Sequence, residues 1–500
     1  MHIDLEPAVA IDRKEVRPFL DIETVRSQTS PIVLEAAQDA HRAIRQNKEA
    51  LDKWANRLPH LLQNDAGANT ATISSKDAEI ITLGTGSALP SRYRNVSATL
   101  LRVPGWGSVL FDCGENTLGQ LKRVFGHEWR DVLGELRFIW ISHMHADHHL
   151  GTASVVKAWY AIVHGSVPGP RVIATDETGE DAFRRLLAPE QRRLAVVGEP
   201  AMLHWLHEYA QVEDVGYSRI APLCVSPAVP ARAVASALNW FFPPETGAEG
   251  DARFSMAESL ALRGQRRVQV EWMGLADLQA VQVQHCHGAR AVSVTWPSPA
   301  RSSSSTATSF KVSYSGDCRP SKAFARIGQH STVLIHEATF DDELHSDAVA
   351  KNHSTTSEAL AVAAGMKARS AVLTHFSQRY QKVPVLDERE GNADGGGPMR
   401  GPRVEMDEET VRDADAAGEP QTMATYKPRS FAPSPSPPPD AVRGDKVTTV
   451  RLEGATGLKF CVAFDYMRVR VGEIAQLARF TPALVALFAE EEEGQEGRGE

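Results

Sequence analysis

The stretch that decides the fold is Phe138-Ile-Trp-Ile-Ser-His-Met-His-Ala-Asp-His148. Its apolar beginning predicts a buried β-strand, and a helix is predicted to follow over Gly151–Val163. Side chains of an extended segment alternate between two faces, so His143 and His145 should point the same way. The turn into the helix can bring the Asp147–His148 pair to a neighbouring position. The stretch therefore predicts two adjacent groups of metal ligands at the end of a strand.

The donor atoms in this stretch suit zinc. Two imidazoles for one ion, and a carboxylate with an imidazole for a second, are ligands that borderline-soft Zn²⁺ accepts. Each ion needs further ligands, and open α/β folds bind ligands beyond the carboxyl ends of their strands. Downstream candidates are His285, His287, Asp317, His336, His353 and His375, of which His285, Asp317, His336 and His375 directly follow strand-like runs. Any one of these histidines, taken alone, could as well be an ordinary, partly buried imidazole.

The composition is that of a globular protein. The chain has 500 residues, of which 42% are hydrophobic and 23% charged, enough for one large domain or two average ones. No apolar run approaches the roughly 18 residues of a membrane span, and the N-terminus lacks the apolar segment of a secretory signal. The five cysteines are scattered without a CxxC pattern. We therefore expect a protein of a reducing compartment that is not secreted and has no membrane partner.

The acidic net charge is unevenly distributed. The chain carries −9 overall, but acidic residues concentrate in segments 387–419 and 490–500. Without these segments the remainder carries a small positive charge. The charge therefore permits RNA binding without arguing for it.

The order of segments predicts one interrupted catalytic domain. Apolar strands alternate with helices from Glu79 onward, which is typical of a layered α/β fold. A helix is predicted over 31–63, whereas 165–270 mixes helical stretches with loops. The predicted organisation is an N-terminal helical and linker segment (1–78), a catalytic domain (79–386), a disordered low-complexity insert (387–445), the C-terminal part of the catalytic domain (446–488) and an acidic tail (489–500).

Several motifs together carry a family resemblance. Beside the HxHxDH run they are Leu83-Gly-Thr-Gly-Ser87, Pro90-Ser-Arg-Tyr-Arg-Asn95, Asp112-Cys-Gly-Glu115, Tyr314-Ser-Gly-Asp317, His336-Glu-Ala-Thr339, His353-Ser-Thr355 and His375-Phe-Ser-Gln-Arg-Tyr380. With them the chain resembles RNase Z, the tRNA 3′-processing endonuclease of the metallo-β-lactamase superfamily, in the catalytic C-terminal half of its long form. The resemblance covers about 79–381 and resumes over about 448–488. It implies an α/β metallo-β-lactamase fold, an αββα sandwich of two mixed sheets flanked by helices.

The resemblance also implies a ligand set for two Zn²⁺ ions. His143, His145 and His285 would hold one ion, Asp147, His148 and His375 the other, and Asp317 would bridge them. His285 is preferred to His287 because the family's ligand comes just after the strand.

Further roles follow from the same resemblance. Asp112 would orient a ligand histidine. Glu337 and His353 would form a relay beside the leaving group, and Asp147 would also take the proton of the attacking water. His336 would be structural. The implied reaction cuts precursor tRNA 3′ of the discriminator nucleotide and leaves a 3′-hydroxyl on the tRNA.

Substrate contacts and partners are likewise implied. The expected substrate-binding residues are Arg92, Arg94, Asn95, Ser377 and Arg379, near the cleavage site or the acceptor-stem phosphates. Taken alone, an arginine in a loop is usually just solvated. The expected partner is precursor tRNA, with a homodimer or a separate N-terminal half as protein partners. The expected location is the nucleus, the mitochondrion or both, and otherwise the cytoplasm.

Two features depart from the family pattern, and other functions compete. Asn116 stands where members often have a second glycine, although Asn tolerates left-handed backbone conformations. Residues 165–270 show no RNA-gripping arm, and the first 78 residues cannot hold the half that carries it in long forms. We expect a fragment or a truncated chain rather than an enzyme that recruits its tRNA differently. The alternatives are a small-molecule phosphodiesterase or esterase of the same fold, an mRNA 3′-end nuclease, and a non-catalytic RNA-binding half.

Overall fold

The structure is a computed structural model. It describes residues 22–55, 76–166, 168, 192–225, 240–241, 270–297, 309–377, 458–480, 482–483 and 486. The predicted insert (387–445), the predicted tail (489–500), a predicted strand at 447–452 and Arg379 lie outside these residues.

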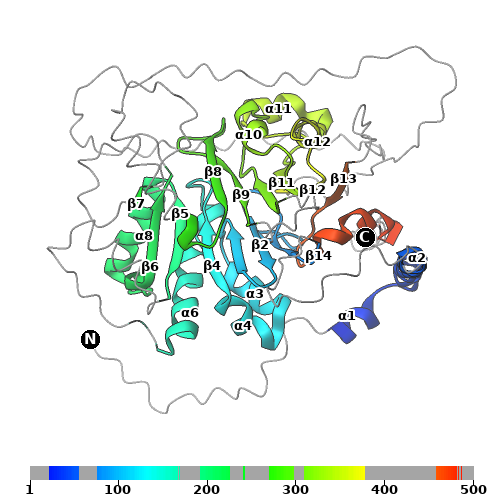
Figure 1. The fold of residues 1–500 in the computed structure, drawn as a ribbon, viewed down its shortest axis with the longest axis horizontal. Coiled ribbons are helices and arrows are strands. Elements are labelled where there is room, and N and C mark those ends of the chain that lie inside the picture. The colour runs from blue at the N-terminus through cyan, green and yellow to red at the C-terminus, as the bar shows by residue number, and fades with distance from the viewer. Residues whose placement is uncertain are drawn as a thin grey trace, which may run out of the picture.

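Two β-sheets form the centre of the molecule (Figure 1). The first has the strand order β14-β1-β2-β3-β4-β5-β6-β7 and the second β13-β12-β11-β10-β9-β8, and both mix parallel and antiparallel pairs. The strands are β1 (Glu79–Gly84), β2 (Ala98–Val103), β3 (Gly107–Phe111), β4 (Leu136–Trp140), β5 (Leu194–Gly198), β6 (Ile220–Cys224), β7 (Trp240–Phe241), β8 (Asp277–Gln282), β9 (Arg290–Thr295), β10 (Lys311–Tyr314), β11 (Val333–Glu337), β12 (Ser370–Thr374), β13 (Lys459–Val462) and β14 (Arg468–Arg470).

The central strands carry apolar side chains on both faces, and both faces are covered. Ile80 packs in the core between the two sheets, whereas its neighbour Ile81 packs under the outer helices. The central core combines side chains such as Phe138 and Trp140 of the first sheet with Val312 of the second. Because burial stabilises by about 25 cal/mol per Å² of apolar surface, this central layer contributes to the stability of the fold.

Helices complete the outer layers. The outer face of the first sheet packs against α3 (Thr117–Phe125), α4 (Trp129–Gly134), α6 (Thr152–His164) and α8 (Pro200–Val212). The second sheet packs against α10 (Lys322–Ile327) and α12 (Thr356–Gly365). The remaining elements are α1 (Ile22–Gln28), α2 (Pro31–Ala55), α5 (Ala146–His149), α11 (His345–Ala350) and the 3₁₀ helices η2 (Gly126–Glu128), η3 (Tyr217–Arg219), η5 (Asp342–Leu344) and η6 (Val471–Phe480). The predicted αββα sandwich is thus confirmed.

The last described segment completes both sheets. β13 adds in parallel to β12, and β14 pairs antiparallel with β1 at the edge of the other sheet. Residues 458–480 therefore belong to the same layered unit as residues 79–377. None of the helices in the described ranges is long and apolar enough to cross a membrane.

The structure differs from the sequence-based expectations in places. The region 165–270 contributes the buried strands β5 and β6, which we predicted as part of a helix-and-loop mixture. The predicted helix after Gly472 is a 3₁₀ helix that begins at Val471. Helix α2 ends at Ala55, and residues 56–63 of the predicted helix lie outside the described part.

Candidate metal centre

The seven predicted metal ligands converge at one end of the two sheets. They come from four loops, each directly after a strand or a short extension of it. His143, His145, Asp147 and His148 follow β4, His285 follows β8, Asp317 follows β10 and His375 follows β12. The sandwich brings these four loops together because the carboxyl ends of the strands concerned face the same edge.

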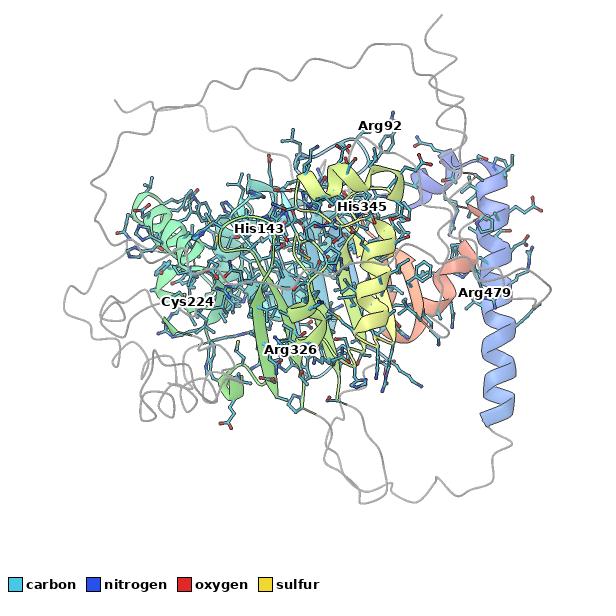
Figure 2. The ribbon with its side chains drawn as sticks, turned by 90° about the horizontal axis from the view of Figure 1, so that it is seen from above. Arg92, His143, Cys224, Arg326, His345 and Arg479 are labelled. Atoms are coloured by element: carbon cyan, nitrogen blue, oxygen red, sulfur yellow. The ribbon has the colours of Figure 1, made fainter. Side chains whose placement is uncertain are left out.

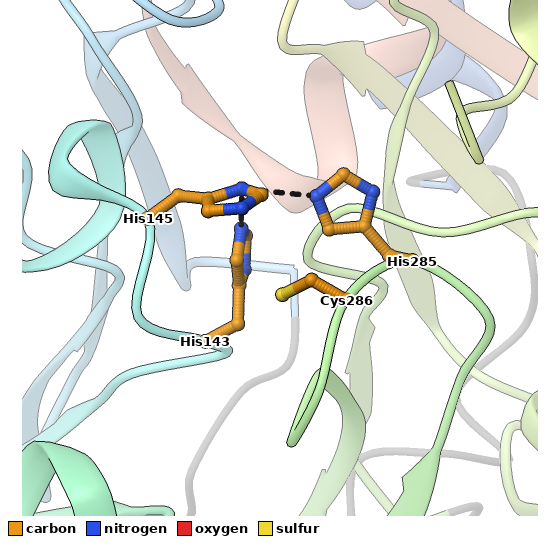
Figure 3. Close-up of side chains that lie close together, drawn as sticks. All are labelled: His143, His145, His285 and Cys286. Carbon is orange, nitrogen blue, oxygen red and sulfur yellow. Dashed lines mark hydrogen bonds between the residues drawn. The ribbon is translucent and has the colours of Figure 1, made fainter. Parts of the chain in front are cut away.

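One half of the cluster is a group of three imidazoles (Figure 3). The Nδ1 atom of His145 lies 3.0 Å from Nε2 of His143 and 3.1 Å from Nε2 of His285. Asp317 Oδ2 faces the same group, 3.8 Å from Nε2 of His143 and 3.6 Å from Nε2 of His285. Zn–N bonds of about 2.0–2.1 Å at tetrahedral angles place two nitrogens about 3.3 Å apart. The three imidazoles therefore have the spacing of ligands to one ion.

The other half joins Asp147, His148 and His375. Asp147 Oδ2 lies 3.5 Å from Nε2 of both histidines. Asp317 reaches this group too, with Oδ2 3.3 Å from Nε2 of His148 and Oδ1 3.3 Å from Nε2 of His375. The Asp317 carboxylate thus lies between the two groups, where a bridging ligand would be.

Orphaned buried atoms test whether a cation fits. Nε2 of His148, Nε2 of His375 and Oδ1 of Asp317 are all buried without a hydrogen-bond partner. Buried polar atoms are nearly always paired, so three unpaired ones around one point need an explanation. A divalent cation, which takes lone pairs from imidazole and carboxylate alike, supplies one. The residues present therefore fit a metal.

The hydrogen bonds on the far side of each ring orient the imidazoles. Nδ1 of His143 faces Ser142 Oγ at 3.0 Å, and Nδ1 of His285 faces the Asn352 carbonyl at 3.0 Å. Nδ1 of His375 faces Thr339 Oγ1 at 2.9 Å. An Nδ1–H that donates outward leaves the Nε2 lone pair facing the cluster. His145 is different, because its Nδ1 atom is the one that faces inward.

Asp112 orients His148. It is fully buried and accepts from His148 Nδ1 at 2.7 Å, the Ser142 backbone N–H at 2.7 Å and the Tyr314 hydroxyl at 2.6 Å. Its φ of 55° is left-handed, as is that of His375 at 61°. Such strained conformations cost roughly 1–3 kcal/mol each and cluster at functional sites. The backbone is therefore strained at Asp112, which orients His148, and at the proposed ligand His375.

We expect Asp112→Asn to weaken zinc binding about 10–100-fold, the usual effect of losing an outer carboxylate partner of a ligand histidine. The amide removes the negative charge that holds the His148 Nδ1–H. Competition with a fluorescent zinc chelator measures the change. The exposed Asp131→Asn is the control, and equal affinities for both variants would show that Asp112 does not act through the metal.

Two of the proposed ligands have pKa shifts that favour the forms that bind a cation. His148 does not, because burial lowers its pKa but the carboxylates of Asp317 and Asp147 outweigh burial and raise the pKa well above the usual value. Burial and the nearby His148 lower the pKa of His143 well below its usual value, so this imidazole is neutral. Burial opposes ionisation of Asp147, but His148 and His375 outweigh it and lower the pKa of this carboxyl far below its usual value. Asp147 is therefore a carboxylate, and its Oδ2 also accepts the Ala88 backbone N–H at 2.7 Å.

Glu337 and His353 form a pair beside the cluster. Glu337 is buried and accepts from the backbone N–H of Cys318 at 2.7 Å and of Ser354 at 3.0 Å. Its Oε1 lies 3.0 Å from His353 Nδ1. Burial favours the neutral imidazole, but the Glu337 carboxylate prevails and raises the pKa of His353 to about 9. Arg319 Nη1 also donates to the His353 carbonyl at 2.6 Å, which fixes the backbone here.

The other candidate histidines lie outside the ligand groups. His336 is buried, and its Nδ1 donates to the Glu337 carbonyl at 2.7 Å, which is a structural contact. His287 is exposed. Within the described residues neither belongs to a group that could hold a metal. Cys286, which we did not predict, does belong to one, with His143, His145 and His285. Its only sequence signal was its place next to His285.

The predicted substrate residues lie in different environments. Arg92 is exposed, at the edge of the molecule in Figure 2. Arg94 is instead engaged within the protein, where Nη1 donates to Thr85 Oγ1 at 2.6 Å and to the Ala463 carbonyl at 2.8 Å. Burial lowers its pKa to about 10. Asn95 is buried, and its Nδ2 donates to the Glu115 carbonyl at 2.8 Å. Direct RNA contact by Arg94 or Asn95 would therefore require these bonds to be exchanged.

The loop after β12 holds the predicted substrate residues Ser377 and Arg379, and it is described as far as Ser377. The Ser377 backbone N–H donates to the Thr339 carbonyl at 3.1 Å. Ser377 is thereby bonded to the residue whose hydroxyl faces His375 Nδ1. Arg379 lies outside the described residues. Asn116 adopts the left-handed conformation with φ 63° at the start of α3, so the asparagine serves the turn that a glycine would otherwise make.

Comparisons with known proteins agree with this architecture. Residues 78–189 match the family described as anti-Pycsar protein Apyc1. The chain is 35% identical over 363 residues to the mitochondrial tRNase Z TRZ3 of Arabidopsis thaliana, covering 68% of this chain and 36% of that protein. It is 35% identical over 321 residues to zinc phosphodiesterase ELAC protein 2 of Homo sapiens, covering 64% of this chain and 32% of that protein.

A solved structure extends the agreement to the fold. The crystal structure of a long-form RNase Z from yeast matches with a TM-score of 0.53 and 28% identity, over 85% of this chain and 46% of that one. The predicted resemblance to RNase Z proteins and the predicted metallo-β-lactamase fold are thereby confirmed. The chain spans about a third of the length of the curated relatives it matches.

Proposed function

We propose that this chain is a zinc-dependent endoribonuclease that removes 3′ trailers from precursor tRNA. It cuts 3′ of the discriminator nucleotide and leaves a 3′-hydroxyl on the tRNA. The observation that carries the proposal is the cluster of five imidazoles and two carboxylates, with Asp317 between its two halves. Relatives named tRNase Z and RNase Z supply the substrate class.

The proposed ligands divide between two zinc ions. His143, His145 and His285 would hold the first, Asp147, His148 and His375 would hold the second, and Asp317 would be shared by both. The relative named a zinc phosphodiesterase and the mixed imidazole and carboxylate donors support the choice of metal. When bound, two such ions activate water and stabilise charge on the attacking and leaving oxygens.

The chain's own residues supply the proton transfers. Asp147 is ionised and held by the Ala88 backbone N–H, so its carboxylate can accept the proton of the attacking water. The raised pKa of His353 keeps its imidazole protonated at neutral pH, and Glu337 fixes its orientation. His353 can thus give a proton to the departing ribose oxygen.

Recognition of the tRNA uses the loops beside this cluster. Arg92 is the exposed cation of the first loop, with Arg94 and Asn95 behind it, and Ser377 and Arg379 are assigned to the acceptor-stem phosphates. A second copy of this chain, or a separate N-terminal half, adds further contacts to the tRNA. The proposed location is the mitochondrion, as in the name of the plant relative, with the nucleus as a second site. The catalytic domain is assigned to 79–386 with 446–488, supported by the pairing of β13 and β14.

The test is cleavage of a 3′-extended precursor tRNA by zinc-loaded protein. Asp147→Ala is the inactive variant, and Asp347→Ala, an exposed aspartate on α11, is the matched control. We expect one cut after the discriminator nucleotide with wild type and Asp347→Ala, and none with Asp147→Ala. Hydrolysis of bis(p-nitrophenyl) phosphate without any cut in RNA would contradict the tRNA substrate and favour a small diester.

A further inference from the structure

Cys286 is the one cysteine placed to meet a metal. All five cysteines lie in described residues, and Cys113, Cys224, Cys318 and Cys461 are buried, whereas Cys286 is partly exposed. Its Sγ belongs to one group with the inward nitrogens of His143, His145 and His285, all within 4.8 Å of one another (Figure 3). A partly exposed thiol thus stands beside three imidazoles.

The thiol is free to turn toward these nitrogens. The hydrogen bond that Sγ makes is a weak one to the His287 carbonyl at 3.7 Å. Zn–S bonds of about 2.3 Å and Zn–N bonds of about 2.0 Å at tetrahedral angles place sulfur about 3.6 Å from each nitrogen. From within 4.8 Å this needs a shift of about 1 Å, which a side-chain rotation in a partly exposed loop can supply.

A second observation points to a ligand at the same place. Asp317 is almost fully buried, and its Oδ2 lies 3.8 Å from Nε2 of His143 and 3.6 Å from Nε2 of His285, whereas its unpaired Oδ1 faces His375 in the other group. The group therefore offers three nitrogens, one carboxylate oxygen and one sulfur. Sulfur donors select softer cations, whereas oxygen donors favour harder ones.

We propose that Cys286 is an additional ligand at the three-histidine position and that it is recruited by soft divalent cations. On binding, the thiol proton passes to solvent, a metal–sulfur bond forms, and a metal-bound water is released. Catalytic sites keep an open position and closed four-ligand sites do not. Added to the three imidazoles and Asp317, the Cys286 thiolate would take the position that water or substrate uses, so that a soft cation occupies the site in a form that cannot admit substrate. This inference rests on the metal centre of the proposed function.

Native thiol alkylation is the direct test, because only Cys286 is accessible among the five cysteines. Metal-free protein treated with iodoacetamide should be alkylated at Cys286, as located by peptide mass spectrometry. Loading with Cd²⁺ should slow this alkylation at least about tenfold and add a thiolate-to-Cd²⁺ absorption in the ultraviolet, since sulfur is then bonded to metal. Cys286→Ser should lack that absorption, whereas Cys224→Ser, at the buried end of β6 and outside every possible ligand group of the described residues, should keep it.

Metal content separates the two proposals. If the wild-type protein binds Cd²⁺ but Cys286 is still alkylated and the absorption is missing, the thiol is not a ligand. The metal centre then stands without Cys286. If no Cd²⁺ and no Zn²⁺ bind at all, the metal centre itself is overturned. If the zinc-loaded protein does not cut RNA while Cd²⁺ still protects Cys286 in a separate sample, the role of Cys286 holds and the proposed substrate fails.

Discussion

Asp317→Ala is expected to remove the bound metal and to lower kcat/KM for precursor tRNA by roughly 10³–10⁴-fold. The Asp317 carboxylate lies between both ligand groups, within 3.3 Å of Nε2 of His148 and of His375. Losing it removes a ligand from each ion at once. Metal ions contribute several kcal/mol of transition-state stabilisation, and about 5 kcal/mol corresponds to that loss in rate.

Zinc content by mass spectrometry and single-turnover kinetics check this result. The melting temperature, measured with and without zinc, separates loss of metal from loss of fold. Wild type should gain stability with zinc because a ligand that binds only the native state stabilises it, and Asp317→Ala should not. Asp347→Ala should behave as wild type. Full zinc content in Asp317→Ala would show that the two ligand groups do not share this carboxylate.

His353→Ala is expected to slow cleavage by about 10²–10⁴-fold at neutral pH without changing the zinc content, the usual contribution of a general acid. His353 is outside both proposed ligand groups but lies 3.0 Å from Glu337 Oε1. The loss should fall on kcat, because proton donation to the leaving group matters in the transition state. The exposed His127→Ala is the control. Loss of zinc from His353→Ala would instead make it a metal ligand.

The pH profile gives this relay a second readout. Glu337 raises the pKa of His353 to about 9, so the acid form is complete at neutral pH and is lost as the pH rises through that value. Activity should therefore fall on the alkaline side. In Glu337→Gln the carboxylate that raises the pKa is gone, and the fall should move to lower pH. An unchanged alkaline limb in this variant would exclude His353 as the group that titrates.

Much of the centre could be predicted because its ligands follow strands. The run from Phe138 to His148 has the periodicity of a buried strand and then the spacing of paired ligands, both of which are local properties. The strand-like runs before Asp317 and His375 marked the other loops in the same way. Which loops meet depends on sheet order, and that information came from the family resemblance rather than from periodicity.

What the sequence did not reveal was set by tertiary packing. Arg94 looks like a solvated cation of a loop, but its guanidinium lies over the Phe376 and Phe464 rings and donates to Ala463. All three partners are distant in sequence, so no local pattern could predict these contacts. Cys286 is a scattered cysteine until the loop after β8 places it beside three imidazoles. Strands β5 and β6 were missed because short apolar runs do not distinguish a strand from a helix.

The position of β13 and β14 has a consequence for synthesis on the ribosome. Until residues 458–470 leave the exit tunnel, β12 and β1 are the edges of their sheets, and β12 is buried along its whole length in the finished protein. Such edges invite pairing with other chains. At about 5–20 residues per second, translation leaves them open for seconds after β12 has been made. A nascent chain of this protein should therefore depend on chaperones until β13 and β14 cover these edges. The new edge strands have only four and three residues.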